Sequence, residues 1–167
     1  TKLEGEQAVS SRTERYATLR TAWLYGARGR NFLKAILKAA LRNGEKGVRV
    51  VNDQLGCPTW AATLAQQIAR VVESRPTGLF HAAAQGWCSR DQQARRFLEK
   101  MGVACPVTPC RSEEYLTPAQ RPANSILENR RLKEAGLNVM RDWTADMDEF
   151  VARHGAAVMS EIKGAIG

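Results

Sequence analysis

Apolar and polar positions along the chain recur with two different periods, one typical of strands and one typical of helices. Short apolar runs bounded by turn residues predict strands at residues 16–25, 48–51, 79–83 and 105–109. Apolar residues spaced three and four apart predict helices at residues 31–43, 60–73, 90–101, 129–135, 142–154 and 156–166. Residues 1–11 have the mixed pattern of the end of a further helix. Strands that alternate with helices indicate an α/β fold.

The helix predicted at residues 31–43 has the clearest two-sided pattern. Asn31 is a suitable N-cap and Gly44 a suitable stop. Its apolar face is expected to carry Phe32, Leu33, Ile36, Leu37, Ala40 and Leu41, and its polar face Lys34, Lys38 and Arg42.

Capping residues also predict where the next two helices begin. Thr59 is expected to cap the helix at residues 60–73, and Ser89 with Gln92 forms a capping box for the following helix. The first of these helices is expected to turn Leu64, Ile68, Val71 and Val72 inward. His81, on the strand between them, is interpreted as a core or rim histidine rather than a catalyst.

The chain is organised around residues 48–59, where a short strand passes through a polar turn into a helix. The turn contains Asn52, Asp53, Gln54 and Gly56 and delivers several hydrogen-bonding groups to one point. Loops that rigid elements hold in this way often carry binding residues. Two interpretations stay open at this point: the residues either only build the turn or contribute to a ligand site.

Composition and charge narrow the classes of protein. The 167 residues suit one domain, and the formal charge is +8 with 25 lysines and arginines. The basic residues are scattered, without a run of five or a nucleic-acid motif, so a solvated basic surface is favoured over a nucleic-acid partner. No apolar run approaches the ~20 residues that a membrane span needs. The start is polar, unlike a signal peptide, and a cytoplasmic protein is expected.

The four cysteines are Cys57, Cys88, Cys105 and Cys110. No CxxC pair occurs, and the two histidines are distant in sequence, so no zinc site is expected. Reduced, mostly buried thiols are expected instead.

Five segments, taken together and in order, resemble dTDP-4-dehydrorhamnose reductases, which are extended short-chain dehydrogenases/reductases. The segments are TKLEGE at 1–6, LRTAWLY at 19–25, GRNFL at 29–33, VVNDQLGCPT at 50–59 and RPANSIL at 121–127. The resemblance extends to about residue 148 and implies the C-terminal substrate-binding lobe, with the last elements of a Rossmann sheet. It places the nucleotide-binding half outside this chain. It implies a tail of the Rossmann lobe with a crossing helix at 1–47 and a substrate-binding lobe at 48–167.

The resemblance also implies a reaction, the reduction of the C4 keto group of dTDP-4-dehydro-L-rhamnose to dTDP-L-rhamnose by NADPH or NADH. Such enzymes use a Tyr-x-x-x-Lys pair on one helix face, in which the tyrosine donates a proton and the lysine holds the nicotinamide ribose. Lys2 stands at the lysine position. The tyrosine would stand four residues earlier, ahead of Thr1. We therefore expect this chain alone neither to bind NADPH tightly nor to turn over.

The remaining site residues follow from the resemblance, residue by residue. Ala22 would present backbone to the nicotinamide. The expected substrate-binding residues are Trp23, Asn31, Phe32, Gln54, Gly56, Arg121 and Asn124. Arg121 could pair with a diphosphate oxygen. Simpler interpretations stay open for three of them: Trp23 as a core aromatic, Asn31 as a helix cap only, and Arg121 as a surface residue beside a proline.

Departures from the family pattern are local. Arg90, in Cys88-Ser-Arg-Asp91, stands where many relatives carry an aromatic residue, and the tail after His154 has no recognised counterpart. A lobe separated from its neighbour should expose apolar surface, so a homo-oligomer is expected. Three other functions stay open: a non-catalytic regulatory relative, another nucleotide-sugar reductase or epimerase, and a basic nucleic-acid-binding domain. No membrane partner is expected.

Overall fold

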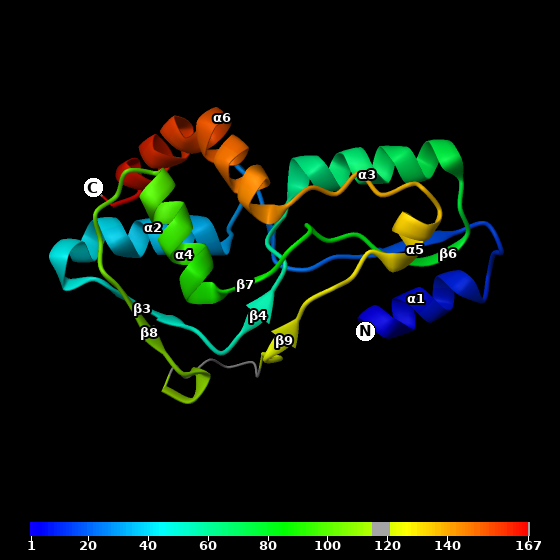
Figure 1. Ribbon diagram of the computed structural model, residues 1–167, viewed down its shortest axis with the longest axis horizontal. Coiled ribbons are helices and arrows are strands. Elements are labelled where there is room, and N and C mark those ends of the chain that lie inside the picture. The colour runs from blue at the N-terminus through cyan, green and yellow to red at the C-terminus, as the bar shows by residue number, and fades with distance from the viewer. Residues whose placement is uncertain (115–120, 167) are drawn as a thin grey trace.

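Figure 1 shows the computed structural model, which describes residues 1–114 and 121–166. Helices gather at its two ends, with the short strands β4, β7 and β9 between them. At one end lie α2 (Phe32–Asn43), α4 (Arg90–Lys100) and α6 (Trp143–Gly164). At the other end lie α1 (Lys2–Ser10), α3 (Ala61–Ser74) and α5 (Arg130–Glu134). Two 3₁₀ turns, Gly44–Lys46 and Ser112–Glu114, complete the described helical elements.

The strands of the described residues are short and pair mostly in parallel. Strand β1 (Ala17–Arg20) pairs with β6 (Gly78–His81), β2 (Leu24–Tyr25) with β5 (Thr59–Trp60), and β3 (Val48–Val51) with β8 (Val107–Cys110). Strand β4 (Leu55–Gly56) lies between β7 (Cys88–Ser89), antiparallel, and β9 (Asn124–Ser125), parallel. Parallel pairs require crossover connections, which the helices supply here. The predicted α/β fold is confirmed.

The larger core joins α2, β3, α4 and α6 around one aromatic side chain. Phe150 of α6 is buried, and its ring meets those of Tyr25 edge-on at 5.2 Å and Trp60 at 6.1 Å. Leu33 and Leu37 of α2 belong to the same cluster. A smaller cluster joins Leu64, Val71, Phe80, Ala82, Leu132 and Met140, with Leu19 packed against it. Each cluster brings residues of the segment 1–47 into contact with residues of the segment 48–167. The expected division of the chain into these two units stays a prediction.

The long strand predicted at residues 16–25 is wrong, because the chain turns inside it. Trp23 has φ = 44°, in the left-handed region that L-residues seldom occupy. Strand β1 therefore ends at Arg20, and β2 begins only at Leu24 with a different partner. The aromatic and apolar composition fits a strand, but the composition does not report the backbone reversal.

The two helices predicted after Asp142 are one continuous helix, α6. Asp142 caps it as predicted, accepting a hydrogen bond from the Thr144 N–H at 2.8 Å. Gly155, which suggested a break, is buried inside the helix. A Cβ built there would lie 3.2 Å from the Met101 Sδ, so the glycine allows the chain after α4 to approach closely.

Two of the predicted helix faces need correction. The start of α2 is confirmed, since Asn31 Oδ1 accepts from the Lys34 N–H at 3.1 Å. However, Lys34 is only 6% exposed, because its ammonium lies 2.7 Å from the Glu161 carboxylate of α6. On α3, Ile68 and Val72 are 44% and 66% exposed, although Leu64 and Val71 are buried as predicted.

Thr59 does not cap α3. Its hydroxyl donates to the Cys57 carbonyl at 3.1 Å and accepts from the Ala84 N–H at 3.1 Å, so it ties β5 to the segment after β6. The capping box of Ser89 and Gln92 is confirmed at the start of α4.

Three thiols, those of Cys57, Cys88 and Cys110, are buried and free, and Cys105 is partly buried and free. Among the described residues, no three histidine, cysteine, aspartate or glutamate side chains gather as a metal site would require. None of the described helices has both the length and the apolar character needed to cross a bilayer.

Asp146 makes stability depend on pH in a defined direction. Burial raises the pKa of its carboxyl group above the ordinary value, and the Thr63 and Arg141 side chains only partly offset this. The folded state therefore holds the Asp146 proton more tightly than the unfolded state does. Protonated Asp146 stabilises the fold, and this stabilisation is lost as pH rises from the ordinary aspartate pKa through the raised pKa of the folded state. Nearby Glu149, whose pKa is lowered by Arg141, acts in the opposite sense.

We therefore expect the Asp146→Asn variant to lack the destabilisation that ionised Asp146 causes. Urea unfolding at about pH 4 and about pH 7 measures this, as the difference between variant and parent at each pH. The free energy of unfolding of Asp146→Asn, relative to that of the parent, should be larger at the higher pH. The control Glu73→Gln, which replaces an exposed carboxylate, should show no such increase. An equal difference at both pH values would contradict the assignment.

Candidate active site

A cavity of about 1200 Å³ lies between β2, the start of α2, the turn after β3 and the start of α4. Its walls include Trp23, Asn31, Phe32, Asp53, Gln54 and Arg121. The polar turn, the tryptophan segment and the Arg-Pro segment therefore meet at one cavity. The family resemblance assigns substrate-binding residues to all three segments. Because these segments are far apart in the chain, their convergence is a property of the fold.

Trp23 forms one wall through an unusually close approach to Gly56. A Cβ built on Gly56 would lie 2.6 Å from Trp23 Nε1 and 2.7 Å from Cδ2, and closer still to Cε2. Only a residue without a side chain leaves room for the indole in this position. Trp23 has a positive φ, and its indole packs directly against the Gly56 backbone. Gly56 therefore helps to set the position of this cavity wall.

Asn31 and Phe32 stand where α2 begins. Both ends of the Asn31 amide are engaged: Oδ1 accepts from Lys34, and Nδ2 donates to the Gly26 carbonyl at 2.8 Å. The side chain is thus a helix cap that also lines the cavity. The Phe32 ring is partly buried and lines the same wall.

The turn after β3 is held by Ser112. Asp53 Oδ2 accepts from the Ser112 N–H at 2.9 Å and Oδ1 accepts from its hydroxyl at 2.6 Å. These hydrogen bonds lower the pKa of Asp53 below its usual range. Gln54 Nε2 donates to the same hydroxyl at 3.1 Å. Both side chains line the cavity while they build the turn, so the two interpretations of this stretch are compatible.

Arg90 lines the cavity but is absent from the site residues predicted from the sequence. Its guanidinium carbon lies 3.5 Å from the centre of the Trp23 ring and 4.9 Å from that of Phe32. Burial lowers the pKa of Arg90 to about 10, and the positive charge of Arg121 contributes to this. The sequence signalled the position only as a charged residue where relatives carry an aromatic one. It did not indicate that the ring partners of Arg90 are Phe32 and Trp23, which lie 58 and 67 positions earlier in the chain.

Arg121 and Asn124 lie on the same segment but differ in their relation to the cavity. Arg121 is exposed and lines the cavity, which is compatible both with a binding residue and with a surface residue beside a proline. Asn124 belongs to β9, and its Oδ1 accepts from the Ile126 N–H at 2.9 Å. It is not among the residues that line the cavity in the described part of the chain.

Lys2 and Ala22 lie outside the cavity walls formed by described residues. Helix α1 has no buried residue and is joined to β1 by Glu6, whose carboxylate accepts from Arg20 at 2.9 and 2.6 Å. Lys2 is exposed at the first turn of that helix, and Ala22 follows β1 and is partly buried. The chain end that bears Lys2 lies toward the carboxyl end of β1 (Figure 1).

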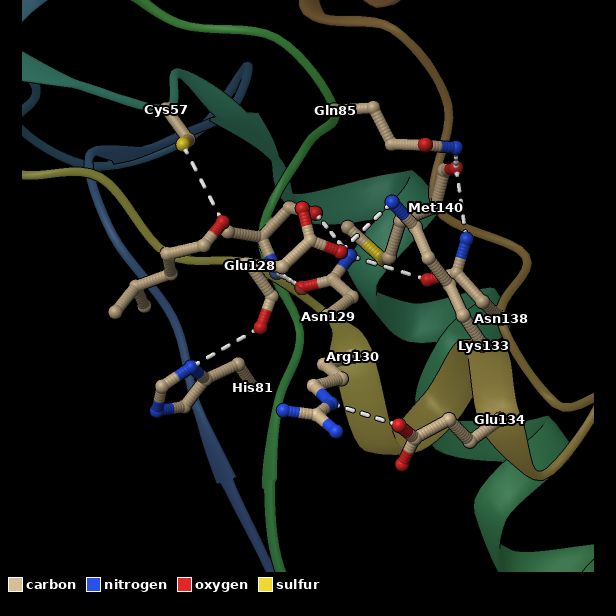
Figure 2. Close-up of polar contacts among 12 residues, drawn as sticks. Cys57, His81, Gln85, Glu128, Asn129, Arg130, Lys133, Glu134, Asn138 and Met140 are labelled. Carbon is tan, nitrogen blue, oxygen red and sulfur yellow. Dashed lines mark hydrogen bonds and ion pairs between the residues drawn. The ribbon is translucent and has the colours of Figure 1, made fainter.

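A separate polar cluster gathers around Asn129, and His81 lies at its edge (Figure 2). His81 Nδ1 lies 3.2 Å from the Glu128 carbonyl, and the side chain is partly buried. Buried Asn129 accepts from the Ala83 N–H at 3.0 Å and donates to the Ala83 carbonyl and to Asn138. This network fastens the segment before α5 to the end of β6. The interpretation of His81 as a rim histidine is consistent with this placement.

Comparison with known proteins identifies the family. The model for the RmlD substrate binding domain matches residues 1–155. The chain is 38% identical to a dTDP-4-dehydrorhamnose reductase of Mycolicibacterium smegmatis, over 91% of this chain and 47% of the relative. A crystal structure titled as a dTDP-4-dehydrorhamnose reductase of Clostridium acetobutylicum superposes with a TM-score of 0.86 at 35% identity, over 90% of this chain and 53% of that one.

A further crystal structure, of a dTDP-4-dehydrorhamnose reductase from Bacillus anthracis in complex with NADP, also has a TM-score of 0.86, at 31% identity. It covers 91% of this chain and 53% of that chain. The chain thus spans about half the length of the curated relatives that it matches. The matched residues, 1–155, include every segment that lines the cavity. The chain therefore belongs to the RmlD substrate-binding domain family.

Proposed function

We propose that the whole protein containing this chain reduces the C4 keto group of dTDP-4-dehydro-L-rhamnose to dTDP-L-rhamnose, and that this chain binds the sugar nucleotide. One observation carries the proposal: Trp23, the Asp53–Gln54 turn and Arg121 converge on a cavity of about 1200 Å³. Concave sites with apolar walls and a few convergent polar groups are typical of small-molecule binding. The relatives named dTDP-4-dehydrorhamnose reductases suggest the identity of the sugar.

The substrate roles follow from position along the cavity. Trp23 and Phe32 offer flat apolar surfaces to a sugar or base ring, and Arg121 offers a cation to the diphosphate. Asn31 and Gln54 shape the walls between them, and Gly56 keeps Trp23 in place. In this proposal Asn124 acts through the position of its strand, because its side chain bonds its own segment.

A nicotinamide nucleotide would meet the chain at the carboxyl end of β1, where parallel strands β1 and β6 end at the same edge. The cofactor, NADPH or NADH, supplies the hydride that reduces the keto carbon. Ala22 fits this role because its small side chain leaves the backbone accessible. Lys2 stands one turn before Glu6, on the helix face that meets Arg20, and in this proposal its ammonium would hold the ribose of the cofactor.

A turnover assay of the whole protein tests the proposal. We expect oxidation of NADPH or NADH with dTDP-4-dehydro-L-rhamnose and weaker reaction with UDP- or GDP-linked keto sugars. This chain alone is expected to bind the dTDP-sugar without turning over. Absence of turnover by the whole protein, with the dTDP-sugar bound, would favour a regulatory relative. Preference for another nucleotide would favour a different reductase or an epimerase.

The proposal includes a cytoplasmic location and self-association. Apolar side chains are exposed on two helices at the same end of the molecule, Leu3 and Val9 on α1 and Ile68 and Val72 on α3. Such surface favours association with another protein surface. Light scattering measures the mass of the chain in solution, and a monomer mass at all concentrations would contradict self-association.

A further inference from the structure

Arg90 differs from two other charged residues of the cavity, Arg49 and Asp53, in the chemistry around it. Arg49 is paired with Glu114 at 2.5 Å, and the Asp53 carboxylate is occupied by Ser112. Among the described residues, no carboxylate oxygen lies within 4.0 Å of an Arg90 nitrogen. Aromatic rings stand beside its guanidinium instead. Cation–π contacts offset only part of the cost of withdrawing a cation from water.

The stacking leaves the hydrogen-bonding edge of the guanidinium available. A guanidinium has five N–H donors in one plane, and stacking uses its faces rather than its edges. Among the described residues, only Gln93 Oε1 accepts from Arg90, at 3.1 Å from Nη1. The rings of Trp23 and Phe32 thus orient the group, and most of its donors have no acceptor among residues 1–114 and 121–166.

A second guanidinium, that of Arg121, lines the same cavity without a carboxylate partner among the described residues. Arg121 also lowers the pKa of Arg90, as a like charge nearby does. Two such cations repel each other until an anion lies between them. A diphosphate fits this need better than a single carboxylate, because it carries charge on two linked groups and can accept from both guanidinium edges.

We propose that Arg90 and Arg121 together bind the diphosphate of the sugar nucleotide, with Arg90 held in position by stacking on Trp23 and Phe32. The identity of the nucleotide rests on the proposed function, whereas the diphosphate site rests on the cavity alone. The site makes Trp23 serve two purposes: it forms the cavity wall, and it orients the cation that receives the phosphate groups. Arg90 is thus a substrate-binding residue and a determinant of affinity for diphosphate over monophosphate ligands.

Calorimetric titration of this chain with inorganic pyrophosphate, and separately with thymidine diphosphate, tests the proposal. We expect Arg90→Met to weaken both affinities by about 10- to 100-fold, as loss of charge-assisted hydrogen bonds does. Arg90→Lys keeps the charge but loses the planar edge of the guanidinium, so its affinities should lie between those of Arg90→Met and the parent. Arg70→Met, an exposed arginine on α3 away from the cavity, is the matched control and should leave both affinities unchanged.

Tryptophan fluorescence gives a second readout that does not depend on the stability of the arginine variants. Pyrophosphate should change the emission of the parent, and Trp23→Phe should remove that change. A parent chain that binds neither anion, or an Arg90→Lys chain that binds both as tightly as the parent, would overturn the proposal. Because pyrophosphate needs neither the sugar nor the cofactor, failure of the turnover assay with pyrophosphate binding intact would reject the proposed reaction alone.

Discussion

Replacing Phe150 by alanine is expected to lower the free energy of unfolding by about 3–5 kcal/mol, the largest loss that we expect from one side chain. The ring is 1% exposed and meets Tyr25, Trp60, Phe97 and His154 with centroid distances of 5.2 to 6.5 Å. Its removal therefore takes away buried apolar area and leaves a cavity among rigid rings that cannot collapse into it. Urea unfolding of the variant and the parent measures the difference.

The control for Phe150 lies on the surface of the same molecule. Val72→Ala, at a position 66% exposed on α3, should change the free energy of unfolding by less than about 0.5 kcal/mol. If Phe150→Ala costs less than about 1 kcal/mol, the cluster that joins β2, β5 and α6 is not the main core. The same result would also argue against the described cavity, because Tyr25 and the start of α2 both line the cavity and pack in this cluster.

Gly56→Ala is expected to displace the Trp23 indole and to weaken sugar-nucleotide binding by about tenfold or more. The new methyl group would stand 2.6 Å from Nε1 and 2.7 Å from Cδ2, distances that real side chains do not tolerate. Overpacking of this kind also costs about 1–3 kcal/mol of stability. Because Arg90 stacks on the same ring, the displacement should disturb two elements of the site together. Calorimetry with thymidine diphosphate and the emission of Trp23 report both effects.

A second glycine provides the control. Gly5→Ala lies on α1, where nothing stands within 4 Å of the added methyl group, and it should leave binding unchanged. Its stability should stay equal or rise, because alanine favours a helix over glycine by up to about 1 kcal/mol. If Gly56→Ala keeps the parental affinity and emission, the indole has another position that serves equally well. In that event the close approach would be incidental to binding.

Local features account for what the sequence predicted well. The caps at Asn31, Ser89 and Asp142 and the strand at residues 48–51 each depend on neighbours within a few positions. The same is true of the apolar stripe of α2, whose period alone indicates the buried face. The resemblance to a family added the convergence of distant segments on one cavity, which no period or cap could indicate.

The misses share one cause, which is contact with distant parts of the chain. Trp23 adopts a positive φ that its residue type disfavours, and its indole packs against Gly56. Gly155 lies inside a helix, where its lack of a side chain leaves room for Met101, and Lys34 is buried because its ammonium pairs with the Glu161 carboxylate. Neighbouring residues could not reveal any of these partners.

Short-range periodicity and segments that match in order are enough to predict the alternation of strands and helices, three of the helix caps (Asn31, Ser89 and Asp142) and the family. Only the packing of distant segments places the guanidinium of Arg90 against the rings of Trp23 and Phe32, in the lining of the same cavity as Arg121. The reason is physical: local preferences act over about one turn of helix, whereas the position of a cation in a cavity is set by which distant surfaces pack together.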